Sequence, residues 1–196
     1  MKFTIPKKAL SHFKKADSIL FEYTKNVSIN REINPNHFDE LVRSIIYQQI
    51  SIKAGATIYD RLVNLCDITP ENIINIDDKT LQQIGISFRK VSYIKDLAEK
   101  VISNEVNLDI LSTLSNDNVV DMLIKVKGIG TWTAEMFLMF SLGRMDVNSL
   151  NDLGIRRGFE NLYGIPASKE TFSKYVEKWT PYNTIAAFYL WEASKK

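Results

Sequence analysis

Helical spacing of apolar residues is the feature that most limits what this chain can fold into. Apolar residues in the segments 10–23 and 89–103 recur every three or four positions, which places them on one face of an α-helix. No stretch alternates apolar and polar residues between the turn signals of a β-hairpin, so the sequence predicts an all-α fold. Further helices are expected over 38–47, 51–66, from 69–70 onward, and over 115–125, 131–142, 153–162, 168–178 and 184–193.

Composition excludes several classes of protein. Cys66 is the only cysteine, which rules out an internal disulfide and any four-cysteine zinc site or iron–sulfur cluster. No apolar run approaches the ~20 residues that span a bilayer, and no continuous apolar segment of a secretory signal follows the first lysines. We therefore expect a protein that is not secreted and has no membrane partner.

A glycine-containing turn between two expected helices is the strongest local motif. In Val126-Lys127-Gly128-Ile129-Gly130, glycine tolerates positive φ and lets a partner approach the backbone closely. Thr131 can cap the apolar helix that follows, and the N–H groups at such a helix start suit a phosphate. The alternative is an ordinary turn between helices with glycine at a helix C-terminus.

A lone carboxylate, Asp152, precedes the expected helix 153–162. It can be a plain N-cap, or an anion placed for chemistry. The two roles are compatible, because the N-terminus of a helix favours negative charge.

Four separated blocks of sequence resemble one family, the helix-hairpin-helix (HhH-GPD) DNA glycosylases, in its alkylpurine branch, that of 3-methyladenine DNA glycosylase II. The blocks lie at 38–56, 85–98, 123–158 and 179–191 in the family's order, and together they cover most of residues 36–193. The resemblance implies two helical lobes with the active cleft between them, in one glycosylase unit spanning 1–196. We expect 36–120 to form one lobe and 1–35 with 121–196 to form the second, which would carry the hairpin and Asp152.

The activity that the resemblance implies is hydrolysis of the N-glycosidic bond of alkylated purines in duplex DNA, without a lyase step. The substrates would be 3-methyladenine and 7-methylguanine, with ethenoadenine and hypoxanthine as further candidates. We expect a monomer with no required cofactor and no iron–sulfur cluster. It would work at the nucleoid of a prokaryotic cytoplasm or in a eukaryotic nucleus.

The resemblance makes Asp152 the catalytic carboxylate. Many relatives have a second acidic residue where this chain has Asn151, and the helix that follows aligns Asp152 with the catalytic place. Cleavage passes through an oxocarbenium-like sugar, whose positive charge a nearby anion stabilises. A cationic N3- or N7-alkylated purine leaves without a general acid, so one carboxylate is sufficient.

Trp132 stands where the bifunctional relatives carry their Schiff-base lysine, which is why we expect no lyase step. Its ring would stack on a flipped cationic base, an attraction worth roughly 1–2 kcal/mol. Met136, Gln48 and Trp191 are the other expected pocket residues, and packing in the core is the alternative for these aromatic and methionine side chains. Met136 departs from the tyrosine of the best-known bacterial relative.

Most of the remaining candidate residues lie in two turns that are expected to contact DNA. Gln49 is expected to fill the gap that a flipped nucleotide leaves, in a motif where Tyr47 replaces the family's usual glycine. Asn183 also departs from the family, since many relatives have arginine there. The remaining DNA-binding candidates are Lys127, Gly128, Gly130, Thr131 and Arg89, and the candidate carbonyl ligands of a structural Na⁺ or K⁺ are those of Ile124, Val126 and Ile129.

Other functions remain open on sequence alone. Net charge is +2, and segment 121–160 holds as many acidic as basic residues, so any DNA binding depends on a few placed groups. A non-catalytic protein that binds damaged DNA is the first alternative. A glycosylase for oxidised or mismatched bases is the second, opposed by Trp132 and the lack of cluster cysteines. A purely structural helical protein is the third.

Overall fold

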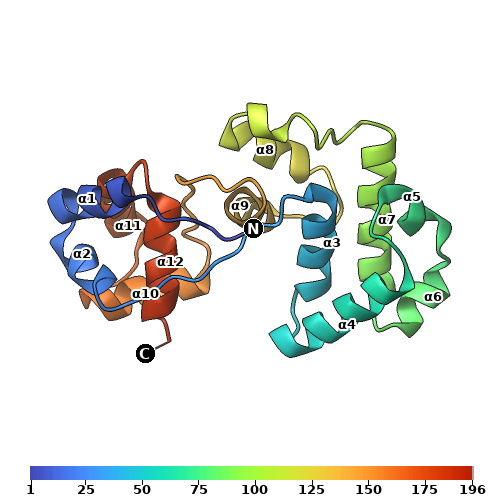
Figure 1. The fold of residues 1–196 in the computed structure, drawn as a ribbon, viewed down its shortest axis with the longest axis horizontal. Coiled ribbons are helices and arrows are strands. Elements are labelled where there is room, and N and C mark those ends of the chain that lie inside the picture. Colours follow the sequence, from blue (N-terminus) through green and yellow to red (C-terminus); the bar gives the residue numbers. More distant parts are fainter. Residues whose placement is uncertain (196) are drawn as a thin grey trace. The chain divides into compact units, whose positions relative to one another are not determined.

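The computed structural model describes residues 1–195, and these are helical almost throughout (Figure 1). The only β-type pairing among them is an isolated bridge between Lys2 and Glu32, so the all-α prediction is confirmed. No helix in this part of the chain has both the length and the apolar character needed to cross a bilayer. The helices are α1 (Lys7–Ala16), α2 (Ser18–Thr24), α3 (His37–Tyr47), α4 (Ile52–Leu65), α5 (Pro70–Asn75), α6 (Asp78–Gln83), α7 (Phe88–Ile102), a 3₁₀ turn η1 (Leu111–Thr113), α8 (Asn116–Leu123), α9 (Thr131–Phe140), α10 (Leu153–Tyr163), α11 (Lys169–Trp179) and α12 (Asn183–Ala193).

The chain divides into two compact units, which are described separately. Unit 1 consists of Met1–Ile33 with Leu138–Lys196, and unit 2 of Asn34–Phe137. The boundary therefore falls within α9 and not near residue 120, where the sequence placed it. Residues 121–137 group with the middle of the chain because the hairpin is tied to α7 and to the end of α3, as described below.

Unit 1 is built on the close packing of α10 against α12. A Cβ atom at Gly158 would lie 1.8 Å from the carbonyl oxygen of Leu190, so only glycine lets the two helices approach this closely. All residues of α12 from Asn183 to Leu190 are buried, and the helix is covered on every side. This near-uniform burial explains why α12 shows no polar face in the sequence.

A buried carboxylate joins three helices of unit 1. Asp17 is a polar residue within the apolar stripe of segment 10–23, and hydrogen bonds to its carboxylate allow it to be buried. It caps α2 by accepting the N–H of Leu20 at 3.0 Å, and it accepts hydrogen bonds from the Tyr163 hydroxyl at 2.6 Å and Trp179 Nε1 at 2.8 Å. Burial raises the pKa of Tyr163 well above its ordinary value, and the hydrogen bond to Asp17 adds to this effect.

Unit 2 is arranged around α7, which packs on α3, α5 and α6. Its helices begin at residues whose side chains accept backbone N–H groups, and the expected caps at Ser51 and at Thr69-Pro70 are confirmed. The same device opens α3, α6, α7 and α8, at Asn36, Asp77, Ser87 and Ser115.

We predict that Gly158→Ala destabilises the protein by about 2–3 kcal/mol, because the added methyl group overpacks the α10–α12 contact. At an ordinary exposed helical position the same change stabilises by about 1 kcal/mol, so the expected sign is reversed. Urea unfolding measures the difference, with Gly130→Ala as the control because a Cβ added at Gly130 would have no neighbouring atom within 4 Å. A Gly158→Ala protein as stable as the wild type would show that the helices are not packed this closely.

Candidate functional site

Asp152 is buried at the N-terminus of α10. Its side chain is 8% exposed, and Oδ1 accepts the backbone N–H of Ile155 at 2.8 Å, which makes Asp152 the N-cap of the helix. The cap that the sequence suggested is therefore present. It coexists with burial, which is unusual for a carboxylate that only caps a helix.

Trp191 of α12 donates a second hydrogen bond to the same carboxylate oxygen, from Nε1 at 2.8 Å. Its ring stacks on Phe140 and Phe188, with centroid separations of 5.8 and 5.9 Å. Gly154 makes the contact possible, since a Cβ there would lie 2.8 Å from Trp191 Cδ1 and 3.1 Å from Asp152 Oδ1. Trp191 was expected to be a pocket residue. Its hydrogen bond to Asp152 and the need for glycine at position 154 could not be predicted from the sequence.

The loop between α9 and α10 is anchored to the start of α12. The hydroxyl of Thr184 donates to the carbonyl of Arg144 at 2.7 Å and accepts the N–H of Val147 at 3.0 Å. The N–H of Thr184 donates to the carbonyl of Met145 at 3.0 Å. Three bonds to one residue thus fix the chain a few residues before Asp152.

Asn183 strengthens this anchor. Its Nδ2 donates to Oδ1 of Asp146 at 2.6 Å, to Oγ1 of Thr180 at 3.0 Å and to the carbonyl of Val176 at 3.2 Å. The residue is 5% exposed, and its own Oδ1 is buried without a hydrogen-bond partner among the described residues. Asn183, a departure from the family pattern in the sequence, thus bonds to the carboxylate of this loop through its side-chain amide.

The glycine hairpin belongs to unit 2 and is held by α7. Gly128 has φ +80°, and a Cβ there would lie 2.1 Å from the ring of Tyr93. Glycine is therefore required both for the backbone conformation and for the close approach of this ring. The N–H of Lys127 donates to Asp96 Oδ2 at 2.9 Å, and the amines of Lys127 and Lys100 lie 3.3 and 2.9 Å from Oδ1. Burial alone would raise the pKa of Asp96, but the bonds from Lys100 and Lys127 outweigh it and hold the pKa below its ordinary value.

The turn after α3 carries Gln49 in a left-handed conformation, with φ +58°. Gln48, which is expected from the sequence in the base pocket, donates from its Nε2 to the carbonyl of Gly128 at 2.9 Å and so ties this turn to the hairpin. Tyr47, in place of the family's glycine, is accommodated by a glycine elsewhere, since a Cβ at Gly55 would lie 2.7 Å from the Tyr47 ring.

Lys90 holds the Gln49 turn through the backbone. Its amine donates to the carbonyls of Ile46 and Gln48 at 2.7 and 2.6 Å, both at the end of α3, where backbone acceptors lose their helical partners. Burial, assisted by the neighbouring charge of Arg89, lowers the pKa of Lys90. Arg89 donates to Oε1 of Gln49 at 3.3 Å, and these side chains line a hollow of about 200 Å³. Sequence reasoning missed the role of Lys90, which only its long-range bonds reveal.

Two other expected site residues lie on the first turns of α9. Trp132 is 44% exposed and Met136 is half-buried. Core packing is therefore excluded as the reason for Trp132, because a tryptophan in a core is covered. An exposed indole can offer a flat apolar surface to a ligand.

The remaining candidates are exposed parts of the hairpin. Gly130 and Thr131 are exposed, and the carbonyl of Val126 accepts the N–H of Ile129 at 3.1 Å. Among residues 1–195 no group of three or more His, Cys, Asp and Glu side chains is placed to hold a metal.

A family model described as HhH-GPD superfamily base excision DNA repair protein matches residues 42–181. DNA-3-methyladenine glycosylase 1 of Schizosaccharomyces pombe is 34% identical over 191 residues, covering 94% of this chain and 82% of that protein. A putative DNA-3-methyladenine glycosylase of Bacillus subtilis is 26% identical, covering 94% and 68%. The chain thus belongs to the HhH-GPD superfamily of base excision DNA repair proteins, which confirms the family expected from the four sequence blocks.

Solved structures agree with this assignment. The DNA-3-methyladenine glycosidase of Bacillus halodurans superimposes with a TM-score of 0.88 at 37% identity, covering 99% of this chain and 92% of that one. The S. pombe 3-methyladenine DNA glycosylase, solved in complex with abasic DNA, gives 0.84 at 34% identity, covering 97% and 98%. The enzyme class expected from the sequence, a DNA-3-methyladenine glycosylase, is therefore borne out by relatives that share nearly the whole chain.

We predict that Lys90→Met loosens the Gln49 turn, because two hydrogen bonds from a charged donor are lost. Each such bond contributes about 1.5–3 kcal/mol, so amide hydrogen exchange in segment 46–51 should accelerate about tenfold or more. Lys95→Met is the matched control, since it breaks a surface pair with Asp78 and leaves the turn alone. Equal exchange of this segment in both variants would contradict the role given to Lys90.

Proposed function

We propose that this protein is a monofunctional DNA glycosylase that hydrolyses the N-glycosidic bond of alkylated purines in duplex DNA, as the first step of base excision repair. The observation that carries the proposal is the buried Asp152 carboxylate, which receives the N–H groups of Ile155 and Trp191 in a chain of the 3-methyladenine glycosylase type. Ile155 and Trp191 each donate a hydrogen bond to this carboxylate. Asp17 has similar partners in a structural role, so the likeness of the chain to 3-methyladenine glycosylases is what favours a catalytic role for Asp152 over binding of damaged DNA alone.

The chemistry follows from one carboxylate. The bond between C1′ and the purine nitrogen breaks with its electron pair passing to the base, which neutralises the positive charge of an N3- or N7-alkylated purine. Asp152 stabilises the cationic sugar that remains. Water then forms the new bond to C1′ and gives up a proton, which the carboxylate accepts and passes to solvent.

Trp132 supports the restriction to hydrolysis and the choice of base. Indole has no amine that could form a Schiff base with C1′, so the abasic strand is left intact. Its exposed ring suits stacking on a flipped cationic purine, and Met136 and Trp191 are proposed as further pocket residues. We propose 3-methyladenine and 7-methylguanine as substrates, with ethenoadenine and hypoxanthine as secondary candidates.

DNA contacts are proposed for the two turns of unit 2. Gln49 would enter the gap left by the flipped nucleotide, and its strained backbone, held by Lys90, would keep the side chain in place. Gly128, Gly130 and Thr131 would hold a phosphate through backbone groups. Lys127 and Arg89 would add charge.

A structural Na⁺ or K⁺ at the hairpin is a further part of the proposal. The carbonyl oxygens of Ile124 and Ile129 lie past the end of α8 and are candidate ligands for a cation. The carbonyl oxygen of Val126 accepts the N–H of Ile129 through one lone pair, which leaves its second lone pair for the cation. These residues fit a weakly held monovalent ion. We also propose a monomer that acts where the DNA is, in a prokaryotic cytoplasm or a eukaryotic nucleus.

We predict that Asp152→Asn abolishes base release while leaving the fold intact, because asparagine is an equally good N-cap but carries no charge. Release of 3-methyladenine and 7-methylguanine from methylated duplex DNA should fall by at least about a hundredfold. Binding to a duplex with an abasic-site analogue should persist and serves as the control. Unimpaired release by Asp152→Asn would mean that another group supplies the catalytic charge.

A pair of identical substitutions tests the orientation of the carboxylate. Trp191→Phe keeps an aromatic ring against Phe140 and Phe188 but removes the bond to Asp152, so single-turnover excision should slow by about tenfold or more. Trp179→Phe removes the corresponding bond to Asp17, which lies in the structural core, so it should lower stability and leave the excision rate of the folded enzyme unchanged. The idea fails if Trp191→Phe excises bases at the wild-type rate.

A further inference from the structure

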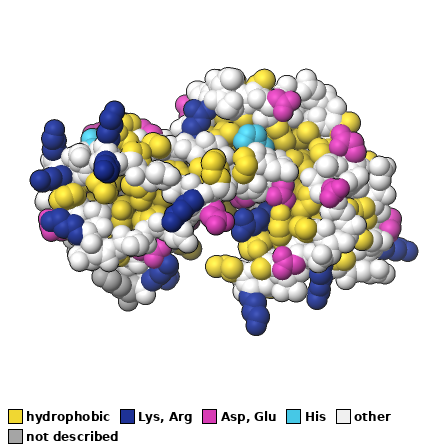
Figure 2. Space-filling view, viewed as in Figure 1, with side chains coloured by type: hydrophobic (Ala, Val, Ile, Leu, Met, Phe, Trp, Pro, Cys, Tyr) yellow, Lys and Arg dark blue, Asp and Glu magenta, His cyan; other side chains and the backbone are white. Residues whose placement is uncertain are grey.

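Helix α1 of unit 1 has lysines along one face and contains no acidic residue. At 100° per residue, positions 7, 8, 14 and 15 fall within an arc of about 120°. All four lysines are exposed. Lys and Arg side chains accordingly stand out over the α1 end of unit 1 in Figure 2.

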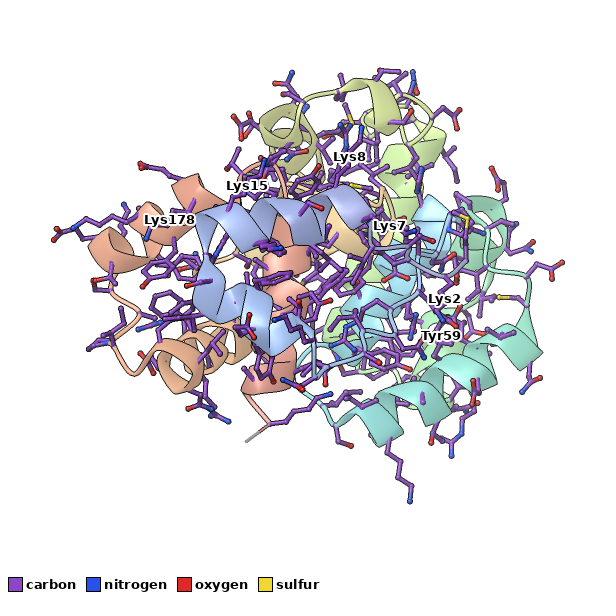
Figure 3. The ribbon with its side chains drawn as sticks, turned by 60° about the vertical axis from the view of Figure 1, so that its left-hand side comes forward. Lys2, Lys7, Lys8, Lys15, Tyr59 and Lys178 are labelled. Atoms are coloured by element: carbon purple, nitrogen blue, oxygen red, sulfur yellow. The ribbon has the colours of Figure 1, made fainter. Side chains whose placement is uncertain are left out.

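The opposite face of α1 is used by the core. Ala9 and Phe13 are fully buried, and α1 packs on α2 and α11. His12 forms a 2.7 Å hydrogen bond with the carbonyl of Lys178, which places the exposed end of α11 beside α1. Figure 3 shows Lys8, Lys15 and Lys178 in succession toward the C-terminal end of α1. The α1 lysine face is defined here as Lys7, Lys8, Lys14, Lys15 and Lys178.

The α1 lysine face forms no ion pair with the described residues 1–195. None of the four lysines on α1 lies within ion-pair distance of a carboxylate there, and Lys178 lies 4.6 Å from the ring centroid of Tyr175. By contrast, the amines of several other lysines lie within ion-pair distance of carboxylates, namely Lys25, Lys95, Lys100, Lys127, Lys174 and Lys195. Like charges gathered on one face repel each other, and this repulsion is unfavourable. Binding of an external anion would reduce it.

We propose that the α1 lysine face is a second DNA-binding surface, which holds the phosphate backbone of duplex DNA whether or not a lesion is present. This inference rests on the proposed function, which makes DNA the substrate, but it concerns a surface that the glycosylase chemistry does not use. Its role is to retain the protein on undamaged duplex between encounters with lesions. Salt-dependent phosphate contacts support such retention because they are independent of sequence.

The dimensions suit a DNA strand. From Lys7 to Lys15 the helix rises about 12 Å, and each strand of B-DNA carries one phosphate per about 3.4 Å of the duplex axis, so several phosphates lie within the length of this face. Each phosphate neutralised contributes about 0.9 to the slope of log affinity against log salt concentration. The four lysines of α1 therefore correspond to a slope of about 3.6.

Other polyanionic partners fit less well. A helix that lies on a membrane inserts its apolar face, and here that face is occupied by the core through Ala9 and Phe13. A protein partner needs a buried anchor, commonly aromatic, and the exposed positions of α1 carry lysines and Ser11. A flexible row of amines with no apolar centre matches a phosphate backbone.

The test compares two variants that remove the same charge. In the face variant, Lys7→Gln, Lys8→Gln, Lys14→Gln and Lys15→Gln are combined. In the control variant, four exposed lysines elsewhere are changed, Lys25→Gln, Lys79→Gln, Lys169→Gln and Lys174→Gln. Glutamine and lysine have similar helix propensities, so thermal unfolding should be close to that of the wild type in both proteins.

Affinity for undamaged duplex is measured by fluorescence anisotropy over a series of salt concentrations. We expect the face variant to bind about tenfold or more weakly near 0.1 M salt and to lose about 3.6 from the salt slope, while the control stays within about twofold of the wild type. Single-turnover excision from methylated duplex at saturating enzyme should be unchanged in both variants.

Equal binding by the face and control variants would overturn the proposal. So would binding of the wild type to anionic phosphatidylserine vesicles through these lysines without their contributing to DNA binding, because the face would then serve a lipid surface. Failure of the proposed function is a separate result, since the wild type would release no methylated purine whatever the binding data show.

Discussion

The hydrogen bond from Trp191 to Asp152 is the interaction on which the rest of unit 1 depends for its function. It brings the last helix against the N-cap residue of α10, and glycine at 154 and 158 leaves out the side chains that would keep the helices apart. A buried carboxylate needs donors, and here one comes from the α10 backbone and one from an indole on α12. Helix packing and the orientation of the candidate catalytic anion are therefore parts of one arrangement.

In unit 2, side chains of α7 hold two turns in place. Its two turns hold strained or glycine-dependent backbone, Gln49 at φ +58° and Gly128 at φ +80°, and each is stabilised by a lysine or carboxylate from α7. Side-chain groups on this helix thus replace the helical hydrogen bonds that the turns lack. The turns that are proposed to meet DNA are consequently held in position before DNA arrives, which lowers the entropic cost of binding.

Much of the fold followed from periodicity and caps, since both are local. The all-α class, most helix ranges and the Asp152 cap are set by residues close in sequence. The unit boundary was missed because it depends on bonds between distant residues, such as that of Lys127 to Asp96. Gln48 was assigned to the pocket by resemblance, and its long-range bond to Gly128 has no sequence signature.

The central claim is that one carboxylate supports hydrolysis of the glycosidic bond with no covalent intermediate on an amine. The most direct measurement incubates the protein with methylated duplex DNA in the presence of borohydride, and analyses the free bases, the strands and any protein–DNA crosslink. We expect free 3-methyladenine and 7-methylguanine, abasic strands that break only after alkali, and no crosslink. A borohydride-trapped complex, or no released base, would contradict it.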